Sequence, residues 1–235
     1  MLARSTKRSG GEGALGTRGL RMAPVLALFT VSIGAARAES AWPPLSSSPP
    51  ARDYELELLW SDHYGLLQKK LPAWGREALR KHIEEVFREV GVTVLWLNEP
   101  LATERVLSPL GVRIVLMPCS GEGWRLPRNT MGAVMDKGLM SRTLYIFFPT
   151  VLRGAGDKTG MGTMLRDPRD VRLLALALAR VVTHEVVHAI DPEIPHVEAD
   201  GIMRAHLTSE KLRGDTLTFT SSTARGIVAA ISRNP

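Results

Sequence analysis

The stretch DPRDVRLLALALARVVTHEVVHAI, residues 167–190, constrains the fold of this chain more than any other. Almost every face of the helix that it predicts is apolar, and a helix of this kind is buried under other elements. Asp167 is placed to cap the helix, Pro168 suits the first helical position, and Asp191 and Pro192 end it. The rest of the chain must therefore supply the elements that cover this helix.

The covering elements are predicted from hydrophobic periodicity. An amphipathic helix is expected in GREALRKHIEEVFREVG, where apolar residues recur at helical spacing and Gly91 is placed to end the helix. Short β-branched or aromatic runs between turn residues predict strands. The strands are expected at residues 92–97, 112–118 and 143–148, with weaker ones at 55–60 and 131–136, and a short C-terminal helix at 223–231. These elements predict an α+β fold, a twisted mixed sheet covered by helices.

The net charge of +6 is concentrated at the start of the chain. Residues 1–38 hold six of the 30 basic residues and one of the 24 acidic residues, which leaves 24 basic against 23 acidic residues in the remainder. A nearly neutral remainder argues against a nucleic-acid partner. The basic leader continues into MAPVLALFTVSIGAA and ARA, which is typical of a secretory signal cleaved after Ala38, with Met22 as an alternative start. An uncleaved anchor is the alternative, but about 15 apolar residues are short for a bilayer span of roughly 20.

The signal predicts an exported protein, periplasmic or secreted, of bacterial type. Residues 39–52 contain WPPLSSSPP and predict an extended linker, so the folded domain is expected at 53–235 with no membrane span. The single cysteine, Cys119, excludes an intrachain disulfide, and the domain must rely on its apolar core. The oligomeric state is left open.

Two histidines and an acid lie near the end of the predicted buried helix. His184 and His188 are four residues apart, so their rings project from one face and can bind one ion. Glu185 is one step round the helix, where its carboxylate can act on a water at that ion without being a ligand. This is the H-E-x-x-H pattern of zinc peptidases. A polar patch where the helix emerges is the alternative, although these groups are costly to bury without a partner.

A catalytic zinc site normally has three protein ligands and an open position. The chain turns after the helix, and His196 follows His188 by eight residues, where a reversal can aim it at the same ion. The alternative for His196 is an ordinary loop histidine. Met203 follows seven residues later in GIM, and a lone methionine is more often core packing.

The stretch from His184 to Met203 resembles the metzincin zinc peptidases, in which H-E-x-x-H-x-x-G-x-x-H precedes a tight turn with a methionine beneath the metal. Here the third histidine comes eight residues after the second instead of six, and Asp191 occupies the glycine place. The longer spacing before GIMRA is similar to a group of compact, exported, metzincin-like bacterial proteins. The resemblance implies a zincin fold around Zn²⁺, in which His184, His188 and His196 are ligands, Glu185 is the general base and Met203 is the Met-turn residue.

Further roles follow from the resemblance. The activity would be hydrolysis of peptide bonds in a peptide or protein substrate, which would lie extended along the edge strand near residues 131–136. His206 either hydrogen-bonds the substrate oxyanion or has a structural role. Asp191 either caps the helix, orients a histidine or is itself a ligand.

Two alternatives remain beside this hypothesis. Cys119 would be the third ligand in a site like that of peptide deformylases, but their glycine-cysteine signature is missing, and the ordinary interpretation is a core cysteine at a strand end. The second alternative is a catalytically inactive zinc-binding envelope module of the same fold. A fourth protein ligand would favour the module, whereas Glu185 favours the enzyme.

Overall fold

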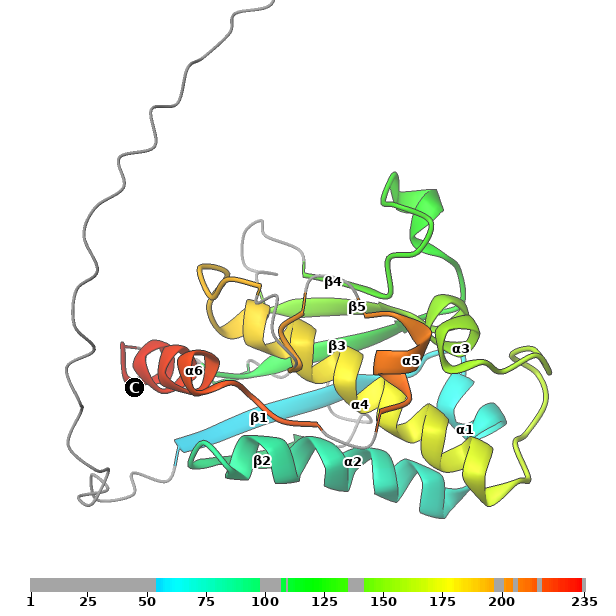
Figure 1. Ribbon diagram of the computed structural model, residues 1–235, viewed down its shortest axis with the longest axis horizontal. Coiled ribbons are helices and arrows are strands. Elements are labelled where there is room, and N and C mark those ends of the chain that lie inside the picture. Colours follow the sequence, from blue (N-terminus) through cyan, green and yellow to red (C-terminus); the bar gives the residue numbers. More distant parts are fainter. Residues whose placement is uncertain are drawn as a thin grey trace, which may run out of the picture. The chain divides into compact units, whose positions relative to one another are not determined.

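A five-stranded mixed sheet with the order β2-β1-β3-β5-β4 forms one layer of the fold (Figure 1). β4 (Gly132–Val134) pairs antiparallel with β5 and ends this order. The other strands run parallel to one another, and they are β1 (Tyr54–Ser61), β2 (Val92–Leu97), β3 (Val112–Met117) and β5 (Thr143–Phe147). Together with the helices, this sheet confirms the predicted mixed α+β class.

This computed structural model describes residues 54–97, 107–108, 110–134, 142–196, 201–204, 207–214 and 217–233. The expected signal peptide at 1–38 and linker at 39–52 lie outside the described residues, and so does His206.

The buried helix is α4 (Pro168–Ile190), and its ends are as predicted. The Asp167 carboxylate accepts a hydrogen bond from the Arg169 backbone N–H at 2.7 Å, and Asp191 is the C-terminal capping residue. α4 packs on β3, β4 and β5 and against α2 (Ala73–Arg88). Among the described helices, α4 is long and apolar enough to cross a membrane, but 83% of its most apolar window is buried inside the protein. It is the central helix of the core.

The sheet is buried on the face that carries α2 and α4. In β3, Val112, Ile114 and Leu116 are fully buried, whereas the alternate residues are only half-buried, as expected for a sheet covered on one side. α2 buries the predicted apolar positions Leu79 and Ile83, and Gly91 follows it with φ 76°, a conformation that favours glycine. The C-terminal helix, α6, spans Ser221–Arg233 and is longer than predicted.

Several short helices are absent from the prediction. They are α1 (Leu66–Lys70), the 3₁₀ helix η2 (Gly121–Trp124), α3 (Phe148–Ala155) and α5 (Ser209–Leu212). The strand expected at 143–148 ends at Phe147, because a helix begins at Phe148 with Pro149 in its first turn. The described part of the edge strand expected at 131–136 is Gly132–Val134. The interpretation of Cys119 as a core residue is wrong, because the chain leaves the sheet before it and the side chain is exposed.

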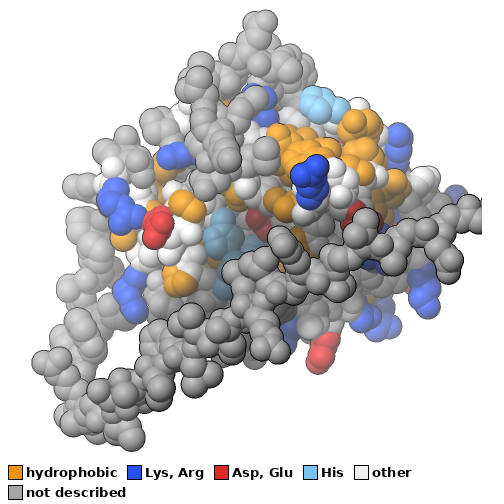
Figure 2. Space-filling model, turned by 90° about the horizontal axis from the view of Figure 1, so that it is seen from above, with side chains coloured by type: hydrophobic (Ala, Val, Ile, Leu, Met, Phe, Trp, Pro, Cys, Tyr) orange, Lys and Arg blue, Asp and Glu red, His pale blue; other side chains and the backbone are white. Residues whose placement is uncertain are grey.

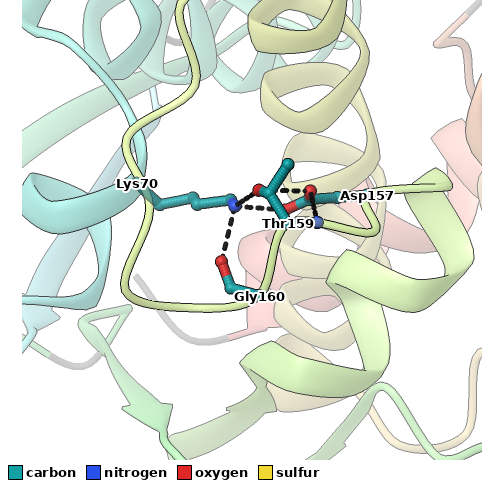
Figure 3. A network of polar contacts seen from close by, with 4 residues as sticks. All are labelled: Lys70, Asp157, Thr159 and Gly160. Atoms are coloured by element: carbon teal, nitrogen blue, oxygen red, sulfur yellow. Dashed lines mark hydrogen bonds and ion pairs between the residues drawn. The ribbon is translucent and has the colours of Figure 1, made fainter.

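A buried charge network fastens the loop after α3 to α1 (Figure 3). Lys70 is fully buried, forms an ion pair with Asp157, and donates to Thr159 Oγ1 at 2.5 Å and to the Gly160 carbonyl at 2.6 Å. Asp157 also accepts hydrogen bonds from Thr159. Burial raises the pKa of Asp157, but the Lys70 and Thr159 contacts outweigh burial, so the pKa lies below its ordinary 3.8.

We expect Asp157→Asn to lower the free energy of unfolding by about 3 kcal/mol, because it leaves the buried Lys70 ammonium without its counter-charge. The folded-state pKa of Asp157 lies below its ordinary 3.8. The stability that its carboxylate contributes is therefore complete above pH about 4 and is lost as the pH falls through the lower, folded-state pKa. The difference between wild type and variant in urea unfolding should therefore narrow below pH about 4. Glu85→Gln, which removes an exposed ion pair with Lys81, is the control and should change stability much less.

Candidate metal centre

α4 presents His184 and His188 on one face, one turn apart, near its C-terminal end. His184 is buried, His188 is half-buried, and His196, which follows the helix, is exposed. The three side chains therefore form a series that runs from the core to the surface. In Figure 2, histidine side chains lie recessed near the centre of the face seen from above.

The turn after α4 brings His196 back to the helix. Asp191 has an extended backbone, with φ −152° and ψ 107°, and its carboxylate accepts hydrogen bonds from the Glu193 N–H at 2.9 Å and from Arg233 at 2.6 Å. The Ile194 N–H donates to the Asp191 carbonyl at 3.2 Å, and the buried Ile194 side chain lies close to Gly226 of α6. The reversal of the chain between Asp191 and His196 is thus held by hydrogen bonds within the turn and by contacts with α6.

The three imidazoles converge. His196 Nε2 is 3.1 Å from His184 Nε2 and 3.0 Å from His188 Nε2, and the ligand nitrogens of all three lie within 4.8 Å of one another. The ring centroids are 4.7 to 5.0 Å apart. Nitrogens bound to one tetrahedral zinc at about 2.0–2.1 Å would lie roughly 3.4 Å apart. The three histidines are therefore close enough to bind one metal ion.

The backbone beyond the turn fixes the ring of His184. The His184 Nδ1 lies 2.9 Å from the Ile202 carbonyl oxygen, and because a carbonyl can only accept, Nδ1 carries the proton. The neutral ring then offers the Nε2 lone pair to the other two histidines, as in metal sites where a carbonyl orients the ligand. Met203 follows Ile202 directly and is 1% exposed, and Gly201 before them has φ 153°. The GIM segment thus contacts His184 through its backbone.

Burial keeps the ligands neutral. The pKa of both His184 and His188 is lowered to about 4, mainly by burial and in smaller part by the neighbouring histidines. The Ile202 hydrogen bond opposes this shift at His184 without cancelling it. At neutral pH both rings are uncharged, which is the form that binds a metal. The donor set therefore fits a metal ion in its chemistry as well as in its geometry.

Glu185 lies beside this cluster and against the edge of the sheet. Burial raises the pKa of its carboxyl to about 7. A Cβ atom added to Gly132 of β4 would lie 2.5 Å from Glu185 Cγ and 2.8 Å from Oε1, so only glycine leaves room for this side chain. β4 and α4 therefore hold the carboxylate between them.

The predicted site residues are only partly brought together. Among the described residues, the group that meets the spacing of a metal site is His184, His188 and His196, and Cys119 is not part of it. Asp191 lies at the end of α4, where its carboxylate holds the turn. The Ile202 carbonyl, Gly132 and Arg233 could not be predicted as parts of the site, because no spacing along the chain links them to the histidines. The GIM motif was the one signal that pointed near Ile202.

The sequence was also compared with known proteins. Neither the models of protein families nor the curated proteins give a match to this chain.

We expect His196→Ala to weaken zinc binding by more than about 100-fold, since even the outer hydrogen-bond partners of metal ligands are worth roughly 10- to 100-fold. Zinc affinity is measured by competition with a chromophoric chelator. His63→Ala is the matched control because His63 is exposed and is not part of the cluster. Equal affinities of wild type and His196→Ala would contradict a three-histidine site.

We expect Gly132→Ala to destabilise the wild type by about 1–3 kcal/mol, because the new methyl group overlaps Glu185. In a Glu185→Ala background the overlapping atoms are gone, so the same substitution should cost little. Urea unfolding of the four proteins of this double-mutant cycle measures the coupling. Gly123→Ala, where an added Cβ meets nothing within 4 Å, controls for the change of residue type. Equal losses of stability in both backgrounds would show that the cost of the added methyl group does not come from its overlap with Glu185.

Proposed function

We propose that this chain is a zinc-dependent endopeptidase of metzincin-like architecture. The observation that carries the proposal is the convergence of His196 on the H-E-x-x-H pair of α4, with Glu185 beside them. The hydrogen bond from His184 to the Ile202 carbonyl and the burial of Met203 support it, since the resemblance places a methionine turn close to the metal. We further propose, from the leader at residues 1–38, that the domain acts after export.

Zinc is the metal that this donor set favours. Three imidazoles whose ligand nitrogens lie within 4.8 Å of one another suit Zn²⁺, and three protein ligands are typical of catalytic sites that keep one position for water. When bound, zinc would polarise the substrate carbonyl and make a water molecule acidic enough to be activated near neutral pH.

Glu185 is the residue proposed to move protons. Its carboxylate is held between α4 and Gly132, so it does not need to reorganise before it acts. It accepts a proton from the attacking water and passes that proton to the nitrogen of the leaving amine. Its pKa of about 7 describes the protein without metal, and a neighbouring cation lowers the pKa and favours the ionised base.

β4 is the proposed binding strand for the substrate. It pairs with β5 on one side and lies against Glu185, so a peptide extended along its other side would place a backbone carbonyl near the histidines. Such strand addition uses main-chain hydrogen bonds and accepts many side chains. It suits an endopeptidase.

We expect Glu185→Ala to lower kcat for peptide hydrolysis by about 100-fold or more, since general acid–base catalysis is worth roughly that much. Zinc content should stay near one per chain in wild type and variant, because Glu185 is not a ligand. The assay follows new amino termini released from a mixed peptide pool and determines zinc in the same samples. Glu193→Ala, an exposed glutamate of the same segment, is the control and should retain activity.

Two outcomes would decide against this function. Hydrolysis by Glu185→Ala at the wild-type rate would show that the proposed mechanism is wrong. One zinc per chain with no hydrolysis by wild type would favour the zinc-binding module instead.

A further inference from the structure

A cavity of about 360 Å³ lies between the carboxyl ends of β1 and β2 and the helices α1 and α2. β1 and β2 are parallel neighbours, so their last residues, Ser61 and Leu97, lie at the same edge of the sheet. The crevice outside the carboxyl ends of parallel strands is a common place for ligands in open α/β sheets. The described lining contains none of the three clustered histidines, so this cavity is separate from the candidate metal centre.

Part of the cavity wall is apolar. Trp60 of β1 is 7% exposed, and its ring stacks on that of Trp96 with the centroids 5.9 Å apart. Leu67 and Leu79 in the same wall are buried, and Leu97 at the end of β2 is half-buried. An apolar cavity of about 150 Å³ is sufficient for benzene. This cavity therefore has room for an aromatic ring or a branched chain with a polar group beside it.

Two arginines of α2 supply hydrogen-bond donors to the cavity. Arg76 and Arg80 are four residues apart, so they project from one face of the helix. Arg76 Nη1 donates to the Leu71 carbonyl at 2.8 Å, and the Arg80 guanidinium lies over the Trp96 ring, 5.5 Å from its centroid. The other N–H groups of both side chains have no acceptor among the described residues. Arginines that are held in place and keep free N–H groups are suited to carboxylates, which they bind through paired hydrogen bonds.

The acidic residues of the lining do not form ion pairs with these arginines. Asp62 Oδ1 accepts a hydrogen bond from the Leu66 backbone N–H at 2.7 Å, and Oδ2 accepts one from the Leu67 N–H at 2.9 Å. The Asp62 carboxylate is thus directed at the start of α1. Glu77 is exposed and forms no ion pair with a described residue. An anion that enters the cavity therefore meets two guanidinium groups that have no carboxylate partner within the described part of the chain.

We propose that this cavity binds a carboxylate attached to an apolar group. The carboxylate lies between Arg76 and Arg80, and the apolar group lies against Trp60 and Leu97. The ligand is either a small organic acid or the C-terminus of a peptide whose last residue is apolar, since both present the same chemistry. This second site does not depend on the proposed peptidase function.

The first experiment titrates the zinc-loaded full chain with phenylacetate and with phenylacetamide, and measures Kd by calorimetry. A parallel pair is a tripeptide that ends in phenylalanine, with a free or an amidated C-terminus. At least one acid should bind with one site per chain, and its amide should bind roughly 10- to 100-fold more weakly, the value of one charged hydrogen bond. Tighter binding of phenylacetate would identify a small acid as the ligand, and tighter binding of the tripeptide a chain end. Saturable binding of neither acid, or equal binding of acid and amide, would overturn the proposal.

Variants assign the binding to the cavity. Arg76→Gln and Arg80→Gln each remove one charge and keep a long polar side chain, so each should weaken binding of the acid about tenfold or more. Arg88→Gln makes the same change at an exposed position of α2 outside the cavity, and should leave the affinity unchanged. Both cavity arginines are half-exposed, so the variants should fold, which urea unfolding checks. An equal loss in Arg88→Gln would overturn the assignment.

A further variant excludes binding at the candidate metal centre, because a carboxylate can also be a ligand of zinc. His196→Ala removes one histidine of the cluster and lies outside the cavity, so it should bind the acid as wild type does. A loss of affinity in His196→Ala, together with wild-type affinity in both arginine variants, would place the acid at the metal and overturn the proposal.

Discussion

Burial of α4 is the constraint on which the rest of the structure depends. The helix is apolar on almost every side, so it is stable only when the sheet covers part of it and α2 and shorter segments cover the remainder. The same burial makes polar groups costly along most of its length. His184 and His188 are tolerated because they lie near the C-terminal end, where exposure increases, and because the Ile202 carbonyl satisfies the Nδ1–H of the more buried ring.

The electrostatics of this end of α4 favour a cation in several independent ways. Burial disfavours a proton on either helical histidine and disfavours a bare charge on Glu185. A divalent ion at the three Nε2 atoms would use the imidazoles as ligands and would also stabilise the ionised carboxylate. The last carbonyl groups of the helix add partial negative charge at the same place. One cation would thus offset the unfavourable burial of His184, His188 and Glu185.

The sequence predicted most of what local rules control. The ends of α4 followed from Asp167, Pro168 and Asp191, and the histidine pair followed from helical spacing. The short helix α3 was missed, because a proline and a glycine in eight residues mask its periodicity. Gly132 and the Ile202 carbonyl were also missed, since their contacts with Glu185 and His184 come from tertiary packing. The position of Cys119 was predicted incorrectly because a strand end gives no information on burial.

The departure from the metzincin spacing has a physical explanation in the turn after α4. No residue of this turn, from Asp191 to His196, has a positive φ, so the glycine of the resembled pattern is not required. Two additional residues give the chain enough length to reverse its direction without a positive φ. A longer connection, however, restricts the position of His196 less than a short one does. α6 supplies the missing constraint through the Arg233 ion pair with Asp191 and the packing of Gly226 on Ile194. Gly226 and Arg233 of the C-terminal helix, which lie more than thirty residues in sequence from Ile194 and Asp191, therefore help to aim His196 at the other two histidines.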